Sequence, residues 1–364
     1  MAWISATYLV TASEDAIRAR AQALALEQSV EMPLAAVTDA QIRDEVVARV
    51  AEIEPVASGR YRVELELAAA TVGTDPAQLM NMLFGNCSLQ EDVELVNVDL
   101  PQTVLQALGG PRYGIAGVRE ITHVFGRPLT CTALKPQGSS PQRLAELCET
   151  FALAGIDIIK DDHGIADQRY APFSERVRLC QAAVERVAER TGRVVRYAPS
   201  LVGAPRRVAE QARFAREHGV RVVLISPLLL GLPAFAEFVR ETGDLAILAH
   251  PSFGGLRISP ALLFGRILRL LGADAVIFPN HGGRFSYSAE VCRDIAESLR
   301  APWDSLAPAF PVPAGGMPVE RAPEMVEFYG VDSVLLIGGS LLIAGDALLE
   351  RSRTFVAAVK AGVV

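Results

Sequence analysis

Cysteines are few in this sequence and are not arranged as metal or disulfide sites usually are. The 364 residues include five cysteines, an odd number, and none is spaced Cys-x-x-Cys with another. Neither a disulfide framework nor a zinc-thiolate site is therefore indicated. We expect all five to be small buried hydrophobic residues. They are Cys87, Cys131, Cys148, Cys180 and Cys292.

An excess of positive charge is also absent. The formal net charge is -7, so no broad basic surface is expected for nucleic acid or for anionic membranes. The sequence has neither an apolar run of about 18 residues nor the basic and apolar start of a signal peptide. We therefore expect a cytoplasmic protein with no nucleic-acid or membrane partner, whose anionic substrates bind local cations or backbone N–H groups.

Short apolar runs alternate with amphipathic helical patterns from residue 128 onward. Eight such runs match a (β/α)8 TIM barrel in number and length. A doubly wound sheet is the structural alternative, but its usual Gly-x-Gly-x-x-Gly is not found. The runs are residues 128–136, 156–163, 194–202, 220–229, 245–253, 274–282, 310–317 and 332–340. The predicted helices include residues 141–154, 173–191, 205–218, 260–271, 288–300 and 319–329.

The part before the barrel predicts a smaller domain. Strands near residues 3–11 and 61–69, with helices near 14–28, 40–52 and 75–84, indicate an α+β, ferredoxin-like domain with an antiparallel sheet. The chain is long enough for two domains. We place the N-terminal domain at residues 1–105, a glycine-rich linker at 106–127 and the barrel at 128–364.

The second apolar run ends in a cation, two carboxylates and an imidazole. Because side chains alternate along a strand, Lys160 and Asp162 should share one face, while Asp161 points the opposite way and His163 lies at the strand's end. Such a lysine can simply form a structural ion pair. It can also be a reactive residue, because functional sites often contain perturbed charged groups.

Other predicted strands also end in polar residues or glycine pairs, as an active site at the C-terminal end of a barrel requires. Lys135 follows the first strand, His250 the fifth and His281 the sixth. The pairs Gly315-Gly316 and Gly338-Gly339 follow the last two strands. Their backbone N–H groups could bind a phosphate, although both pairs could equally be tight turns.

A desolvated lysine near other cations can lose its proton and react. It could then form a Schiff base, or a carbamate with CO2. With Asp162, a carbamate on Lys160 would supply the oxygen ligands that Mg²⁺ prefers. His163 is a softer ligand than Mg²⁺ usually selects.

Several segments in order resemble the ribulose-bisphosphate carboxylase large-chain superfamily. The similarity extends from residue 110 to residue 339, with weaker matches around Glu27 and Asn86. The matching segments are Gly-Pro-Arg-Tyr-Gly-Ile at 110–115, Gly-Arg-Pro-Leu at 126–129, Thr-Ala-Leu-Lys-Pro at 132–136, Ile-Lys-Asp-Asp at 159–162, Pro-Val-Pro-Ala-Gly-Gly at 311–316 and residues 332–339.

The resemblance implies a role for each matching residue. Lys160 would be the carbamylated lysine, with Asp162 and His163 as the other Mg²⁺ ligands. Lys135 would transfer a proton, and His250 would lie near the substrate. Gly315, Gly316, Gly338 and Gly339 would bind phosphate.

The resemblance also implies a homodimer with its active site at the subunit interface. Glu27 and Asn86 match residues that the N-terminal domain of one subunit donates to its partner's barrel. A solvated helix residue and a turn residue are the alternative interpretations of these two positions.

Four departures from the carboxylases change the expected activity. Carboxylases have glutamate at His163, a second lysine at Gln137 and arginine at Pro251, and they close a lysine-bearing loop after strand six. Here that stretch, residues 278–285, contains no lysine. Without this cation to stabilise a developing carboxylate, CO2 fixation is not expected. The pattern is similar to form IV, the rubisco-like proteins.

The residues that remain predict enolisation, in which Mg²⁺ stabilises an enediolate and a lysine moves a proton. Because Arg284 and His281 could bind a substrate carboxylate, the favoured reaction is decarboxylation or carbon-carbon cleavage of a phosphorylated 3-oxo sugar acid, such as 3-oxo-isoapionate 4-phosphate, in sugar-acid catabolism.

Three alternatives stay open. The first is a methionine-salvage enzyme, either 2,3-diketo-5-methylthiopentyl-1-phosphate enolase or methylthioribulose-phosphate isomerase. The second is a Schiff-base aldolase that uses Lys135 or Lys160. The third is a non-catalytic regulatory protein, suggested by His163 in place of an anionic ligand.

Overall fold

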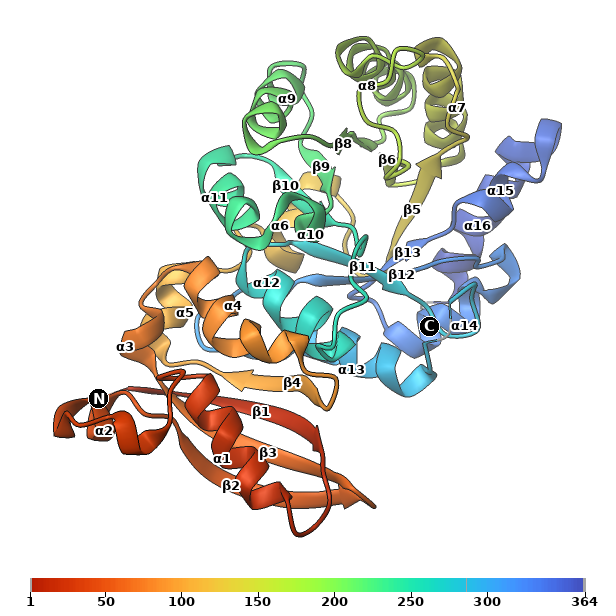
Figure 1. The fold of residues 1–364 in the computed structure, drawn as a ribbon. Helices are drawn as coiled ribbons and strands as arrows, with labels where there is room; N and C mark the ends of the chain where they lie inside the picture. The colour runs from red at the N-terminus through yellow and green to blue at the C-terminus, as the bar shows by residue number, and fades with distance from the viewer. Residues whose placement is uncertain (1, 286, 363–364) are drawn as a thin grey trace. The chain divides into compact units, whose positions relative to one another are not determined.

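The structure is a computed structural model that describes residues 2–285 and 287–362, and the chain forms two compact units (Figure 1). The first unit contains the residues up to Gly109, with Gly254–Leu263 and Asp304–Leu306. The second contains Gly110–Phe253, Phe264–Trp303 and the residues from Ala307 onward. Among the described helices, none is long and apolar enough to cross a membrane.

The first unit is built on a four-stranded antiparallel sheet in the order β2-β3-β1-β4. In β1, Ile4, Ala6, Tyr8 and Val10 are buried on one face, as the period of two requires. The elements of its main segment are β1 (Trp3–Thr11), α1 (Ile17–Glu27), η1 (Leu34–Ala36), α2 (Ala40–Glu45), β2 (Arg49–Ala57), β3 (Arg60–Ala68), α3 (Ala69–Val72), α4 (Pro76–Phe84), η2 (Asn86–Leu89), β4 (Val93–Asp99) and α5 (Gln102–Leu108).

One predicted helix in this unit is wrong in its second half. The helix expected over residues 40–52 ends at Glu45, and β2 begins at Arg49. β2 is mostly exposed, so it lacks the alternation that marks a half-buried strand. Pairing with β3 forms the strand instead, with Glu54 opposite Arg62. β4 was also not predicted from the sequence.

The second unit confirms the predicted parallel α/β barrel. Its strands form two parallel sheets, in the orders β12-β11-β10-β9-β8 and β13-β5-β6-β7. β12 also lies beside β13, and β7 and β8 are one strand path interrupted at Pro199, so eight strand positions form the ring in the described chain. The strands are β5 (Leu129–Leu134), β6 (Ile158–Asp161), β7 (Arg196–Ala198), β8 (Ser200–Leu201), β9 (Val222–Ile225), β10 (Ala246–Ala249), β11 (Ala275–Pro279), β12 (Phe310–Ala314) and β13 (Val334–Leu336).

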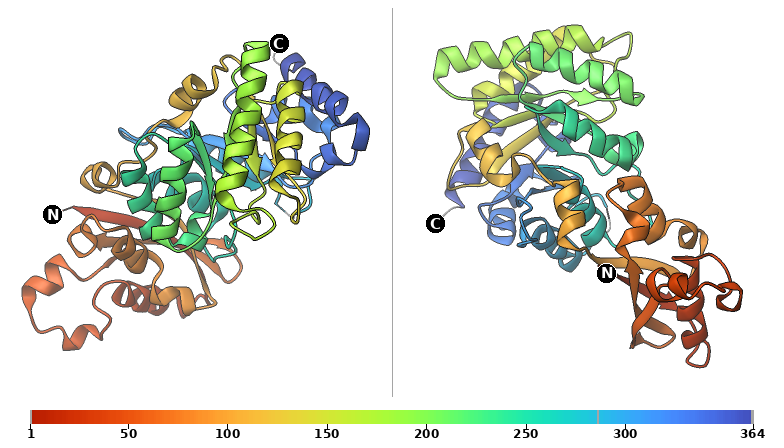
Figure 2. Two further views of the ribbon diagram at one scale, coloured as in Figure 1. Left: turned by 90° about the horizontal axis from the view of Figure 1, so that it is seen from above. Right: turned by 90° about the vertical axis from the view of Figure 1, so that its left-hand side faces the viewer.

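Helices surround these strands, and Figures 1 and 2 show α7 beside α8. Both helices have the predicted bounds, and Ser140 caps the start of α7 by accepting a hydrogen bond from Arg143 N. The helical elements of this unit include α6 (Gly114–Thr122), α7 (Pro141–Ala154), α8 (Phe173–Thr191), α9 (Pro205–Glu217), α10 (Pro227–Leu230), α11 (Leu232–Thr242), α12 (Leu268–Leu270), α13 (Ala289–Arg300), η4 (Val319–Arg321), α14 (Ala322–Tyr329), α15 (Gly339–Leu342), η5 (Gly345–Ala347) and α16 (Leu348–Ala361).

Three other predictions differ from the structure in detail. Residues 106–127, predicted as a linker, contain the ends of α5 and all of α6. The predicted helix at 260–271 is a π-helical turn, η3 (Ala261–Ile267), followed by α12. The run 220–229 includes the start of α10, because Pro227 opens a new helix after β9.

One apolar cluster fills the barrel and extends to α6. It combines Leu129 and Phe310, which open their strands, with Ile115, Val118 and Ile121 of α6. Burial of these apolar side chains stabilises the ring. Polar chemistry is expected at the carboxyl ends of the strands, as in other barrels of this kind.

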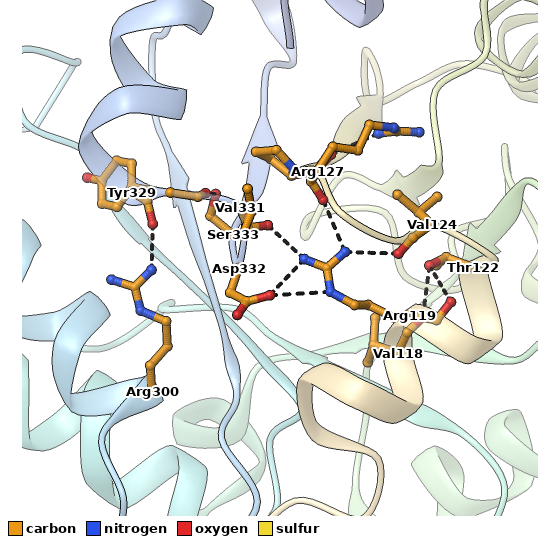
Figure 3. A network of polar contacts seen from close by, with 12 residues as sticks. Val118, Arg119, Thr122, Val124, Arg127, Arg300, Tyr329, Val331, Asp332 and Ser333 are labelled. Carbon is orange, nitrogen blue, oxygen red and sulfur yellow. Dashed lines mark hydrogen bonds and ion pairs between the residues drawn. The ribbon is translucent and has the colours of Figure 1, made fainter. Parts of the chain in front are cut away.

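A buried arginine connects α6 with the segments that precede the first and last barrel strands (Figure 3). Arg119 donates hydrogen bonds to Asp332 Oδ1 at 2.7 Å and to the Val331 carbonyl at 2.8 Å, just before β13. It also donates to the carbonyls of Val124 and Arg127, just before β5. One side chain thus joins the two strands at which the ring closes.

Candidate active site

Lys160 is the penultimate residue of β6, and only 3% of its surface is exposed. Its Nζ donates a hydrogen bond to the Asp161 carbonyl at 3.0 Å. Burial lowers the pKa of Lys160, and the charge of Lys135 acts in the same direction; Cys131, Asp162 and Asp161 oppose these effects without cancelling them. A lysine whose neutral form is favoured is a better nucleophile than an exposed ammonium.

Asp162 lies directly after β6 and contacts two other predicted site residues. Its Oδ1 is 2.7 Å from Lys135 Nζ and 3.4 Å from His163 Nδ1. Burial alone would raise the pKa of Asp162, but hydrogen bonds with His163 and Lys135, together with the charge of Lys160, bring that pKa below its usual value. Asp162 is therefore a carboxylate anion at neutral pH.

Two of the three predicted site histidines lie against each other. The rings of His163 and His250 stack with centroids 4.2 Å apart and planes 13° apart. The Ser252 N–H donates to His250 Nδ1 at 3.2 Å, so Nδ1 is an acceptor and Nε2 carries the proton. Burial, followed by the charge of Lys160, lowers the pKa of His250 to about 2. His250 is thus a neutral imidazole with its donor at Nε2.

The glycine pair after β13 lies close to Lys135. A Cβ at Gly338 would be 3.8 Å from Lys135 Cε and 3.7 Å from the Ala133 side chain. A Cβ at Gly339 would meet nothing within 4 Å. A ligand can therefore approach the backbone at Gly339 beside Lys135.

The glycine pair after β12 is covered by the loop that follows β11. Gly315 and Gly316 have φ of +104° and +83°, which side chains rarely adopt. Arg284 N donates to the Gly315 carbonyl at 2.7 Å, and the ring of Phe285 would lie 3.0 Å from a Cβ at Gly315. The Arg284 guanidinium lies over the Phe285 ring, 5.1 Å from its centroid.

His281 packs against a helix of the second unit. Its ring lies against Phe328 of α14, with centroids 4.7 Å apart, and its carbonyl accepts a hydrogen bond from Arg321. Its Nε2 is buried and has no hydrogen-bond partner among the described residues. Its action as a substrate ligand remains a prediction.

The two residues predicted to serve a partner subunit lie together in the first unit. Asn86 Nδ2 donates to Glu27 Oε1 at 2.9 Å. These residues are 59 positions apart in the sequence, so the fold of this unit brings them together. Their action in a partner's barrel remains a prediction.

Other residues, not predicted from the sequence, orient the site. Ser252 fixes the tautomer of His250, and its position two residues after that histidine was the available signal. Asp161 is tied to Tyr197 and Arg176. Strand alternation predicted that Asp161 faces away from Lys160, but no spacing indicated its distant partners.

Among residues 2–285 and 287–362, no three His, Cys, Asp or Glu side chains are grouped so that they could hold a metal ion. A Mg²⁺ site here therefore needs an additional oxygen. A carbamate on Lys160 would provide it beside the anionic Asp162, with His163 adjacent. With that modification, the residues present fit Mg²⁺.

Comparison with known proteins agrees with this geometry. The family model "Ribulose bisphosphate carboxylase large chain, catalytic domain" matches residues 114–346. The chain is 49% identical to 5-methylthioribulose-1-phosphate isomerase of Rhodospirillum rubrum, over 98% of this chain and 96% of the relative. It is 33% identical to 2,3-diketo-5-methylthiopentyl-1-phosphate enolase of Geobacillus thermodenitrificans, over 99% and 92% respectively.

A solved structure shows the same fold. The crystal structure of a rubisco-like protein from Rhodopseudomonas palustris superposes with a TM-score of 0.93 at 42% identity, covering 99% of this chain and 98% of that one. Similarity over whole chains also includes the N-terminal unit, which the family model does not cover. The chain therefore belongs to the ribulose-bisphosphate carboxylase large-chain family, as a rubisco-like protein and not a CO2-fixing carboxylase.

Proposed function

We propose that this protein is a Mg²⁺-dependent isomerase of a methylthio-pentulose phosphate, the kind of reaction that the name of the Rhodospirillum relative describes. One observation carries the proposal. Lys135 Nζ lies 2.7 Å from Asp162, and its side chain borders Gly338. A proton carrier, a metal-binding carboxylate and a phosphate-binding turn are thus adjacent.

The candidate metal ligands are Asp162, a carbamylated Lys160 and His163. Bound Mg²⁺ would act as a Lewis acid that polarises the substrate ketone. Deep burial of Lys160 favours the neutral amine that reacts with CO2, and Asp162 stays ionised because of its cationic neighbours.

The remaining residues handle the proton and the phosphate. Lys135 Nζ would move a proton from a carbon beside the ketone to another carbon of the same substrate, so no group is gained or lost. His250, neutral with its proton on Nε2, can donate a hydrogen bond to a substrate oxygen. The N–H groups at Gly338 and Gly339 would hold the phosphate, because a Cβ at Gly339 would meet nothing within 4 Å whereas Gly315 is covered by Phe285.

Two exposed aromatic residues support a thioether substrate over a sugar acid. Phe253, three residues after His250, is 74% exposed and has φ of +68°. Phe285 is 50% exposed and lies on Gly315. Methylthio groups bind favourably against aromatic rings. A decarboxylase needs cations for a carboxylate, whereas the Arg284 guanidinium lies over the Phe285 ring and the His281 ring packs on Phe328.

The choice among the candidate reactions can be tested with three substrates. We expect the purified protein with Mg²⁺ and bicarbonate to isomerise 5-methylthioribulose 1-phosphate. Phosphorus and proton NMR monitor the conversion. The 2,3-diketone phosphate and 3-oxo-isoapionate 4-phosphate should stay unchanged. Release of CO2 from the oxo acid would show that the protein is a decarboxylase. Conversion of the diketone alone would show that it is an enolase.

We further propose that the working unit is a homodimer. The support is the contact between Asn86 and Glu27, since a residue donated to a partner's site has to be held in a fixed orientation. The dimer would place this pair at the mouth of the partner's barrel.

A further inference from the structure

A fully buried ion pair lies directly behind the candidate metal ligands. Asp161 follows Lys160 and precedes Asp162, and its side chain and that of Arg176 are both completely buried. Arg176 Nε, from α8, donates to Asp161 Oδ2 at 3.0 Å. The Tyr197 hydroxyl, from β7, donates to Asp161 Oδ1 at 2.8 Å. The backbone N–H of Ser200 donates to Oδ2 at 3.0 Å.

This network fixes the backbone that carries the candidate ligands. The carbonyl of Asp161 accepts the hydrogen bond from Lys160 Nζ, so the residue held by this network is also the hydrogen-bond partner of the candidate lysine. Arg176 Nη1 donates to the Ala171 carbonyl at 2.7 Å. Arg176 therefore joins the end of β6 to the loop that begins with His163.

Stability alone is a weak explanation for such a pair. Desolvation of two charges cancels much of their attraction, and apolar residues of similar size often serve equally well. Partners behind metal ligands, in contrast, commonly fix ligand orientation, and their loss weakens metal binding by about 10- to 100-fold.

We propose that Arg176 and Tyr197, acting through Asp161, are positioning residues that hold Lys160 and Asp162 in the geometry needed to bind a divalent cation. This inference rests on the Mg²⁺ dependence of the proposed function. It assigns these three residues no contact with substrate.

The test is the affinity for Mg²⁺, measured by calorimetry in bicarbonate buffer without substrate. Asp161→Asn and Arg176→Met should bind Mg²⁺ at least about tenfold more weakly than the native protein. Tyr197→Phe removes one hydrogen bond without leaving an unpaired buried cation, so we expect a folded protein with about threefold weaker binding. Thermal unfolding identifies any variant that fails to fold.

Asp157→Asn is the matched control. Asp157 lies just before the same strand, is buried, and accepts hydrogen bonds from Arg127, Thr130 N and Thr130 Oγ1. It supports the opposite end of β6, so Asp157→Asn should reduce stability and leave the Mg²⁺ affinity within about twofold of native.

Three results would overturn the inference: Mg²⁺ affinity within about twofold of native in both Asp161→Asn and Tyr197→Phe, an equal loss in Asp157→Asn, or no Mg²⁺ binding by the native protein. A native protein that binds Mg²⁺ but does not isomerise the pentulose phosphate would count against the proposed function only.

Discussion

At the scale of single residues, Lys135 and Asp162 form an ion pair with each other. The ammonium of Lys135 lies 2.7 Å from the oxygen that would bind Mg²⁺. Binding of the ion therefore requires this pair to separate, which frees Lys135 for proton transfer. The Lys135 ammonium and Mg²⁺ would compete for the same carboxylate, so removing the ammonium should strengthen Mg²⁺ binding.

We predict that Lys135→Met binds Mg²⁺ several-fold more tightly than the native protein, because the competing ammonium is gone, while turnover falls by at least about 100-fold because the proton carrier is gone. Calorimetry and the NMR isomerase assay measure the two effects. Asp162→Asn is the control and should lose Mg²⁺ affinity. Weaker Mg²⁺ binding in Lys135→Met would show that Lys135 supports the metal site instead of competing with the ion.

At the scale of elements, α6 is attached to the strands by Arg119, whose side chain is only 10% exposed. We predict that Arg119→Met lowers the free energy of unfolding by about 2–4 kcal/mol, because Asp332 and several carbonyls lose their donor. Urea unfolding measures the change. Arg190→Met is the control, since its ion pair with Glu149 is exposed and should contribute less than about 1 kcal/mol. Equal effects would mean that the buried network does not hold the barrel closed.

A second attachment of α6 depends on pH. Asp274 accepts hydrogen bonds from the N–H groups of Tyr113, Gly114 and Ile247. Burial raises the pKa of Asp274 to about 6, although these three donors oppose the rise. The folded state thus holds this proton more tightly than the unfolded chain. The stability that the proton contributes is present below about pH 4 and is lost as the pH rises through about 6.

We therefore predict that the free energy of unfolding falls between pH 4.5 and 7.5 by about 2 kcal/mol more in the native protein than in Asp274→Asn. The difference between the two proteins isolates this group, because the other carboxylates titrate in both. Urea unfolding at the two pH values provides the comparison. If the difference in the free energy of unfolding between the native protein and the variant does not change with pH, Asp274 does not titrate in this range.

The sequence predicted elements whose signals are local. Ser140 and Pro141 marked the start of α7, and alternation marked β1, so both were placed with the observed bounds. β2 was not predicted, because it is an edge strand formed by pairing with β3. At the site, Lys135, Asp162 and His163 follow neighbouring strands and lie in contact, as strand order predicts. The packing of His281 against Phe328 had no local signal, because Phe328 lies on a helix far along the chain.

At the scale of the whole molecule, the proposed dimer predicts complementation between subunits. Lys160→Ala and Glu27→Ala subunits should each be inactive alone. Co-expressed, they should form mixed dimers with one intact site, which restores about a quarter of the native activity when pairing is random. Lys160→Ala mixed with Asp162→Asn is the control, since both changes affect the same barrel and no site is restored. No recovery in the first mixture would mean that Glu27 acts within its own subunit, and full activity of Glu27→Ala alone would mean that it does not act at all.

The most direct test of the central claim is proton exchange on the substrate. In D2O with Mg²⁺ and bicarbonate, we predict that the native protein converts 5-methylthioribulose 1-phosphate to an isomer, and that Lys160→Ala or removal of the metal with EDTA abolishes the conversion. Proton NMR records the isomer and any deuterium at the reacting carbons. A native protein that gives neither isomer nor deuterium incorporation, or a Lys160→Ala variant that keeps full activity, would contradict the account.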